Sequence, residues 1–121
     1  MSSNVVRHPN QIDYVEFRAG NPEALTASKQ FYQAAFGWKY QDWAPVYADT
    51  QSSGVQSGIA VDEPTSGRPL PVVYSDNLEK TRDAVLAAGA KLTKDIFSFP
   101  GGRRFQFVDP AGNELGVWTD K

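Results

Sequence analysis

The C-terminal segment from Phe105 to Trp118 predicts a β-hairpin, and this hairpin limits the possible folds more than any other stretch. Two runs of strand-forming residues flank the sequence Asp109-Pro110-Ala111-Gly112-Asn113. Pro110 fixes a φ that suits a turn, and Gly112 or Asn113 can adopt a positive φ at low cost. The alternation predicts an apolar face (Phe105, Phe107, Leu115, Val117) and an opposite face (Gln106, Glu114, Gly116, Trp118).

The N-terminal half of the sequence predicts one strand, one helix and three short strands. The first strand is Ile12–Ala19, where Tyr14 and Glu16 fall on one face. A helix follows from Pro22 to about Phe36, because Asn21 can cap its start and Gly37 can end it. Its expected buried stripe is Ala24, Ala27, Phe31 and Ala35, with Leu25 and Tyr32 beside it. The short strands are expected at 38–41, 46–49 and 55–61.

The C-terminal half repeats this order after a segment rich in proline. A strand is expected from Leu70 to Ser75, and Asp76 or Asn77 can cap a second helix. Leu78, Thr81, Val85 and Ala88 form its expected buried stripe, and Gly89 ends it. A strand at 91–97 and the hairpin complete the half. The boundaries are therefore an arm at 1–10, a first module at 12–61, a linker at 62–69 and a second module at 70–119.

The matching order of elements indicates an internal duplication of a βαβββ module. Such a duplication predicts an α+β fold in which two tandem modules share a mixed sheet. Sequence identity between the halves is weak, so a single α+β sandwich without duplication is the alternative.

Composition excludes several classes of function. The chain has 121 residues, which is the size of one domain, and a formal net charge of −2, which gives no basic footprint for nucleic acid or an anionic membrane. It has no cysteine, so a disulfide framework, a thiolate nucleophile and a zinc-finger site are excluded. No apolar run approaches the length of a membrane span, and the polar start does not resemble a signal peptide. A cytoplasmic location is the default expectation.

Three motifs resemble those of the vicinal oxygen chelate superfamily, which includes glyoxalase I, bleomycin-resistance proteins and extradiol dioxygenases. Residues 31–38 read Phe-Tyr-Gln-Ala-Ala-Phe-Gly-Trp, which is similar to the family's F-Y-x-x-x-F-G-W helix end. Residues 109–113 resemble its D-P-x-G-N turn, and residues 76–78 resemble the start of its second helix. The resemblance spans about 12–118 and implies a cupped mixed sheet with the helices on its outer side.

The resemblance also implies four metal-ligand positions, and none of them carries a usual ligand here. The first falls at about Tyr14, the second around 59–61, the third near Leu70 or Pro71, and the fourth at Gly116. His8, the only histidine, precedes the first strand and is expected to be solvated. We therefore expect no metal and no other cofactor. A weak hard-cation site made by Glu16 and Glu114 is the alternative, and the competing interpretation of both residues is that they are ordinary strand carboxylates.

Covalent catalysis has no candidate residue, but Glu16 is a candidate general base. A carboxylate on the wall of an apolar cup would have its pKa raised by desolvation. The competing interpretation is a partly exposed strand carboxylate without a catalytic role.

The expected ligand-binding residues are mostly aromatic. Flat amphipathic side chains suit a groove that stacks a planar or apolar ligand, although aromatic residues in short strands also serve as core or dimer contacts. By alternation only one of Arg103 and Arg104 can face a pocket, where its guanidinium would meet an anionic group, and a solvated edge is the default for both. The candidates are Tyr14, Trp38, Trp43, Tyr47, Arg104, Glu114 and Trp118, with Tyr40 also beside the cup.

Two classes of function follow from these expectations. The first is a metal-free protein that resembles the bleomycin-resistance branch and binds a small, partly aromatic molecule as a homodimer. The second is a lyase, isomerase or dioxygenase-type enzyme that acts on a small dicarbonyl, thiol-conjugate or aromatic substrate. An accessory domain without a ligand is a third possibility. The homodimer is implied by the resemblance, with the surplus of aromatic strand residues as local support.

Overall fold

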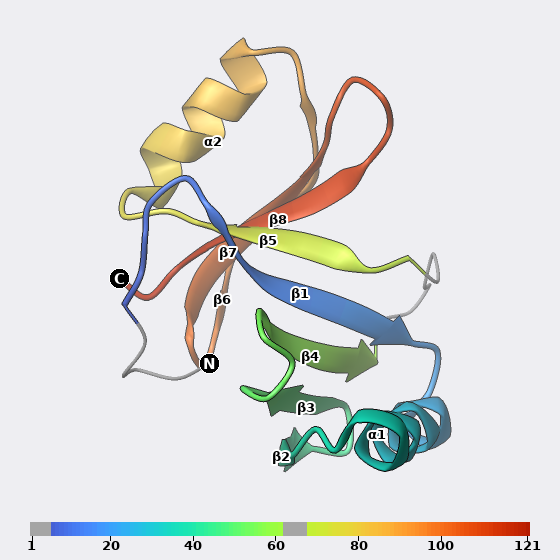
Figure 1. Ribbon diagram of the computed structural model, residues 1–121. Coiled ribbons are helices and arrows are strands. Elements are labelled where there is room, and N and C mark those ends of the chain that lie inside the picture. The colour runs from blue at the N-terminus through green and yellow to red at the C-terminus, as the bar shows by residue number, and fades with distance from the viewer. Residues whose placement is uncertain (1–5, 62–67) are drawn as a thin grey trace. The chain divides into compact units, whose positions relative to one another are not determined.

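The computed structural model describes residues 6–61 and 68–121, in which the same order of elements occurs twice (Figure 1). The expected linker at 62–69 lies largely outside these residues. Contacts divide the chain into two compact units, Tyr14–Leu70 and Pro71–Lys121, and the described residues before Tyr14 belong to the second unit. We refer to these units as the first and the second module, and we assign each strand to the module that holds most of its residues; Ile12 and Asp13, at the start of the first strand, group with the second module, and Leu70 groups with the first.

The first module contains strand β1 (Ile12–Ala19), helix α1 (Pro22–Phe36) and strands β2 (Tyr40–Ala44), β3 (Tyr47–Thr50) and β4 (Gln56–Val61). The strand order is β2-β3-β4-β1. β1 pairs with β4 in parallel, and the other two pairs are antiparallel. This arrangement confirms the expected βαβββ module.

The second module repeats the pattern with β5 (Leu70–Tyr74), α2 (Leu78–Ala87), β6 (Lys91–Phe99), β7 (Gly102–Val108) and β8 (Glu114–Thr119). Its strand order is β5-β8-β7-β6, and β5 pairs with β8 in parallel. The equivalent elements therefore occupy equivalent places. The α+β class with two tandem modules is confirmed, and the single sandwich without duplication is wrong.

Both helices begin at predicted caps, and of the two candidates for the second helix, Asp76 and Asn77, it is Asn77 that caps. The Asn21 side-chain oxygen accepts the Ala24 N–H at 2.8 Å, and the Asn77 side-chain oxygen accepts the Lys80 N–H at 3.1 Å. α1 ends at Gly37, whose φ of 72° lets its N–H reach the Gln33 carbonyl at 3.0 Å. No helix of the described residues is long and apolar enough to cross a membrane.

Each helix packs on one face of its own module's sheet. In the first module the buried cluster is Ala19, Leu25, Ala48 and Ile59. In the second module it is Leu78, Phe105 and Val117. The residues that alternate with these clusters lie on the opposite face of each sheet, which carries most of the candidate functional residues.

The predicted buried stripe of α1 is partly wrong. Leu25 is buried, and Ala24 and Tyr32 pack against the core, as expected. Phe31 is 60% exposed, and Ala27 and Ala35 are also exposed, because the helix turns the row from Leu25 to Tyr32 towards the sheet. In α2, Ala88 is exposed and lies just after the helix rather than in its stripe.

The three short strands of the first module each start one or two residues later than expected, and one strand of the second module ends later. β2 begins at Tyr40 rather than Trp38, because Trp38 stacks on Tyr32 at 5.0 Å between ring centroids and so stays against the helix. β2 also continues to Ala44, beyond the expected end of the strand at 41. β3 begins at Tyr47, and β6 extends to Phe99.

The terminal hairpin has the predicted turn and the predicted faces. The Asp109 carboxylate accepts the backbone N–H groups of Ala111 and Asn113, both at 2.9 Å, and the Asn113 side-chain amide at 3.0 Å. Gly112 has a φ of 89°. Phe105 lies opposite Val117, and Gln106 lies opposite Gly116.

Candidate functional site

A polar surface covers the first module's sheet on the side opposite α1. Glu16 on β1 lies opposite Gly58 on β4, which lies opposite Asp49 on β3. Side chains in such a row point to the same face. We call this surface the first polar face, and it consists of Tyr14, Glu16, Arg18, Tyr47, Asp49, Gln56 and Gly58.

Two phenols meet at the centre of the first polar face. The hydroxyl groups of Tyr14 and Tyr47 share a hydrogen bond, although β4 separates their strands. They meet above Gly58, where a Cβ atom would overlap the Tyr14 hydroxyl oxygen and lie 2.8 Å from the Tyr47 hydroxyl oxygen. A glycine inside a strand often marks a close approach of this kind. The sequence predicted Tyr14 and Tyr47 as candidates but not their pairing.

Burial and negative charge keep Tyr14 protonated. Only 2% of Tyr14 is exposed, and desolvation is the main reason why its pKa is raised far above the usual 10.0. The neighbouring Tyr47 and the carboxylates of Asp49 and Glu16 raise this pKa further. Tyr14 is therefore a neutral phenol across the physiological pH range, able both to donate and to accept a hydrogen bond.

Glu16 is deeply placed for a carboxylate. It is 6% exposed and occupies the middle of β1, beside Gly58 in the register. The competing interpretation of Glu16 as a partly exposed strand carboxylate is therefore wrong, because its side chain is buried. Its catalytic role remains a prediction.

The second module has a corresponding polar surface on the side opposite α2. We call it the second polar face, and it consists of Tyr74, Arg104, Gln106, Glu114, Gly116 and Trp118. A chain of hydrogen bonds crosses it. Arg104 donates to the Gln106 side-chain oxygen at 3.1 Å, and the Gln106 amide and the Thr93 hydroxyl donate to Glu114 at 3.0 and 2.7 Å.

The structure separates the roles of the two neighbouring arginines. Arg103 donates to the Glu79 carboxylate, including one bond of 3.3 Å, at the exposed surface. Arg104 is 9% exposed, and its guanidinium carbon lies 5.8 Å from the centroid of the Phe97 ring. Arg104 is thus the arginine on the polar face, and the expectation of a solvated edge is wrong for this residue.

Trp118 lies on the second polar face but is covered. It is 1% exposed, and its indole N–H donates to the Asp13 carboxylate at 2.9 Å. The guanidinium of Arg7 lies 4.7 Å from the centroid of its ring. Burial raises the pKa of Asp13, while the Trp118 hydrogen bond and the charge of Arg7 lower it in part. Trp118 can therefore stack on a ligand only if Arg7 moves.

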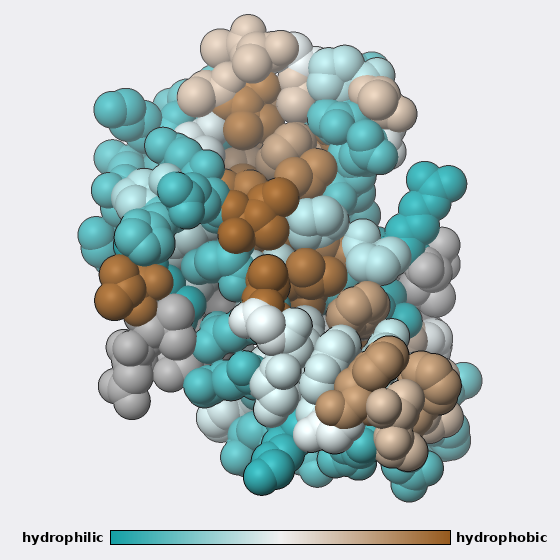
Figure 2. All heavy atoms as spheres, in the orientation of Figure 1, coloured by the Kyte–Doolittle hydropathy of each residue, from teal (hydrophilic) through white to brown (hydrophobic). Residues whose placement is uncertain are grey.

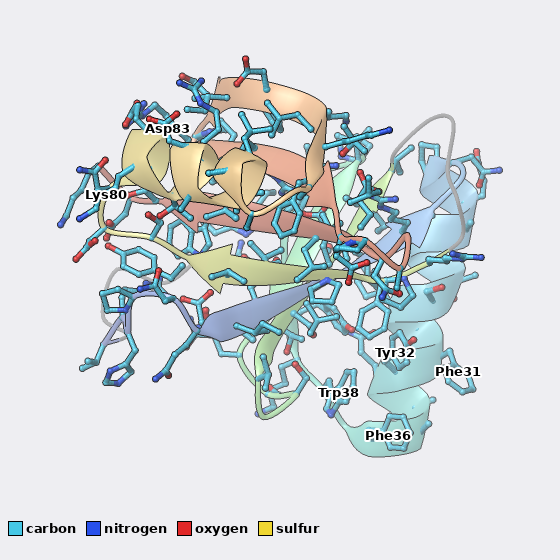
Figure 3. The ribbon with its side chains drawn as sticks, turned by 90° about the horizontal axis from the view of Figure 1, so that it is seen from above. Phe31, Tyr32, Phe36, Trp38, Lys80 and Asp83 are labelled. Atoms are coloured by element: carbon cyan, nitrogen blue, oxygen red, sulfur yellow. The ribbon has the colours of Figure 1, made fainter. Side chains whose placement is uncertain are left out.

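Two predicted ligand residues lie away from both polar faces. Trp38 stacks against Tyr32 and lies 5.3 Å from Phe36, on the side of α1 away from Phe31 (Figure 3). Trp43 is 62% exposed and lines an open hollow of about 420 Å³ between α1 and β2. The placement of these two residues in the cup is wrong, because Trp38 precedes β2 and the register of β2 shifts next to Trp43.

The positions implied for a metal do not suit one. Tyr14 offers a neutral phenol, Gly116 has no side chain, and residues 59–61 are Ile, Ala and Val. Leu70 is buried at the start of β5. In the part of the chain that the structure describes, no three His, Cys, Asp or Glu side chains lie close enough to hold a metal ion. Imidazole and carboxylate ligands are what a divalent metal prefers, so the residues present do not fit the group.

The sequence and the fold together define the family. Residues 11–117 match the Glyoxalase/Bleomycin resistance protein/Dioxygenase superfamily. The protein belongs to this superfamily.

Individual relatives are distant. The chain is 26% identical over 122 residues to the putative glyoxylase CFP32 of Mycobacterium bovis and, equally, of Mycobacterium tuberculosis. The match covers 85% of this chain and 47% of each relative, so the chain spans about half the length of these curated relatives.

Solved structures share the fold at low sequence identity. A Mn(II)-bound glyoxalase from Novosphingobium aromaticivorans has a TM-score of 0.67 at 20% identity, over 95% of this chain and 40% of that chain. An NAD-dependent benzaldehyde dehydrogenase from Legionella pneumophila has a TM-score of 0.70 at 16% identity, over 89% and 98%. These likenesses support the fold alone.

Proposed function

We propose that the protein binds a small, partly aromatic molecule on the polar faces of its sheets and does so without a metal ion. The observation that carries this proposal is the hydrogen-bonded pair of the buried Tyr14 and the half-buried Tyr47, at the place where the family frame would hold its first metal ligand. The chain keeps a polar, deeply placed centre there but supplies no imidazole.

The residues of each face suit a ligand with both a flat ring and polar groups. On the first polar face, Tyr14 and Tyr47 offer hydroxyl groups, and Glu16 and Asp49 offer acceptors. On the second, Arg104 and Glu114 offer opposite charges that Gln106 connects. A few fixed polar groups in a mostly apolar frame are typical of small-molecule sites.

We further propose that the protein is a homodimer, as in the bleomycin-resistance branch that it resembles. The curated relatives are about twice as long as this chain, so a second copy would supply a comparable amount of structure. Hydrophobic residues gather on the surface over α1, where Phe31 and Phe36 are 60% and 62% exposed (Figure 2). Exposed apolar patches often mark interfaces.

A thermal-shift screen tests the binding proposal. A compound that binds only the native state raises the apparent melting temperature by mass action. We expect a planar aromatic compound to stabilise the protein, and Mn²⁺, Ni²⁺ and Zn²⁺ to have no such effect. The substitutions Tyr47→Phe and Arg104→Gln should weaken the response at their own faces, while Arg103→Gln serves as the matched control. Stabilisation by metals alone would reverse the proposal.

A second candidate function is an enzyme that uses Glu16 as a general base. Three observations favour it: Glu16 is only 6% exposed, it lies opposite Gly58 in the strand register, and the phenol of Tyr14 on the same face stays protonated. A carboxylate that removes a proton next to a carbonyl, with a phenol that donates a hydrogen bond to the oxygen, would serve an isomerase or lyase. Turnover of a dicarbonyl or thiol conjugate should then be lost in Glu16→Gln, and intact turnover in this variant would remove Glu16 from that role.

A further inference from the structure

The segment before β1 is tied to the second module. The Asn10 N–H donates to the Tyr74 carbonyl at 2.9 Å, and the Tyr74 N–H donates to the Gln11 carbonyl at 3.0 Å. Asn10 has a φ of 64°, which turns the chain at this point. The residues from Val6 to Gln11, which we call the N-terminal arm, are therefore held next to the end of β5 by backbone hydrogen bonds.

The arm places one cation on the second polar face. The Arg7 guanidinium carbon lies 4.7 Å from the centroid of the Trp118 ring, and its Nη1 lies 3.7 Å from Oδ2 of Asp13. The other carboxylate oxygen of Asp13, Oδ1, accepts the Trp118 indole N–H at 2.9 Å. The guanidinium is thus held between an aromatic face and a carboxylate, and only 11% of the Arg7 side chain is exposed.

The Trp118 ring that Arg7 covers is held in place by other partners. Tyr74 meets the Trp118 ring edge-on, with 5.2 Å between centroids and an interplanar angle of 69°. The Tyr74 hydroxyl donates to the Asp120 carboxylate at 2.8 Å. Because strand pairing and side-chain bonds both fix Trp118, its ring face is already oriented for a cation.

We propose that Trp118 and Asp13 form a cage for a guanidinium cation, that Tyr74 supports the Trp118 ring, and that Arg7 occupies the cage as a latch. While Arg7 is bound, the ring face of Trp118 is covered, and a ligand on the second polar face cannot stack on it. When the arm lifts, the same cage accepts the guanidinium of a ligand. This inference rests on the proposed function only for its statement that the latch controls ligand access to the Trp118 ring.

The chemistry of the cage favours guanidinium over ammonium. A planar guanidinium can stack on an indole face and donate to a carboxylate at the same time, whereas an ammonium is a compact and strongly hydrated charge. One oxygen of Asp13 is engaged by Trp118 and the other faces Arg7, so the cage has one place for a cation.

Chemical rescue tests the cage without any knowledge of the natural ligand. In the background Trp38→Phe/Trp43→Phe, Trp118 is the only tryptophan, since the chain has three. We expect Arg7→Ala to raise the acrylamide quenching constant of Trp118 several-fold. Added methylguanidinium should return quenching towards the parent value, and methylammonium at the same concentration should have a much smaller effect. His8→Ala, at the exposed neighbouring residue, is the matched control and should leave quenching unchanged.

Two results would overturn the proposal. In the first, Arg7→Ala leaves Trp118 as protected as in the parent. In the second, methylguanidinium and methylammonium act alike.

Circular dichroism and a melting curve establish that each variant is folded. If Arg7→Ala does not fold, Asp13→Asn replaces it, because the amide keeps an acceptor for Trp118 but removes the charge that holds Arg7. Quenching in Asp13→Asn should rise several-fold, and an unchanged value would refute the latch. None of these measurements uses a ligand of the polar faces. A negative result would therefore refute the latch alone, and the thermal-shift screen would still test the proposed function.

Discussion

The substitution Gly58→Ala tests whether the two phenols of the first polar face are packed as tightly as the geometry indicates. Gly58 does not have a positive φ, so alanine can adopt its backbone conformation without strain. The added methyl group would overlap the Tyr14 hydroxyl oxygen and lie 2.8 Å from that of Tyr47. Both phenols must therefore move, and their shared hydrogen bond must break.

The expected cost follows from these contacts. Overpacking a filled interior costs about 2 kcal/mol, and loss of a partly buried hydrogen bond costs about 1 kcal/mol. Replacing glycine lowers the entropy of the unfolded chain, which offsets these losses by about 0.7 kcal/mol. We expect the free energy of unfolding to fall by about 2 kcal/mol, which lowers the melting temperature of a domain of this size by about 8 °C.

Urea unfolding followed by circular dichroism measures this change, and Tyr14→Phe provides the control. Phenylalanine lacks the oxygen that the new methyl group would overlap, so Gly58→Ala in the Tyr14→Phe background should cost less than about 1 kcal/mol. The difference between the two backgrounds measures the coupling between residue 58 and the hydroxyl. Equal costs in both backgrounds, or no cost in either, would refute the packing described for this face.

Three further outcomes follow from particular residues. The pKa of Tyr14 is raised above the unfolded value of 10.0, so the native state holds the phenol proton more tightly than the unfolded state does. The stability that Tyr14 contributes should therefore be complete below pH 10 and be lost as the pH rises towards the folded pKa. Unfolding curves at rising alkaline pH should show this loss, and Tyr14→Phe should flatten it. Burial raises the pKa of Tyr40 to about 12, so tyrosinate absorbance at 295 nm should show Tyr40 ionising late and Tyr14 last. Asn21→Ala and Asn77→Ala should each lower the free energy of unfolding by about 1 kcal/mol, because each removes a helix cap. Aspartate at the same positions should cost little, since its carboxylate can also cap. Equal losses for alanine and aspartate would contradict the capping role.

Local chemistry made the elements of this fold predictable. The Asn21 cap, the left-handed Gly37 and the turn at 109–113 depend on residues a few positions apart, and all three were predicted from the sequence. The Asn77 cap was one of two candidates that the sequence left open. The face of each hairpin strand was also predicted, because alternation decides it. The buried row of α1 was less accessible, since two neighbouring rows of that helix are apolar and only the contact with the sheet selects one of them.

Long-range contacts limited the prediction of the candidate site. The pairing of Tyr14 with Tyr47 depends on the register of two strands across β4, which no local pattern specifies. A glycine at position 58 was a signal of close approach that the sequence offered. The cover over Trp118 comes from Arg7, more than a hundred residues away, in the segment expected to be an arm ahead of the first strand.

The most direct test of the central claim is a calorimetric titration of the chelator-treated protein with Mn²⁺, Ni²⁺ and Zn²⁺. The family's metal positions here hold a neutral phenol, apolar side chains and a glycine, so we expect no binding at one ion per chain beyond weak association shared by all three metals. Tight binding at one ion per chain, which Tyr14→Phe or Glu16→Gln abolishes while the fold is kept, would contradict the account and place a metal at the first polar face.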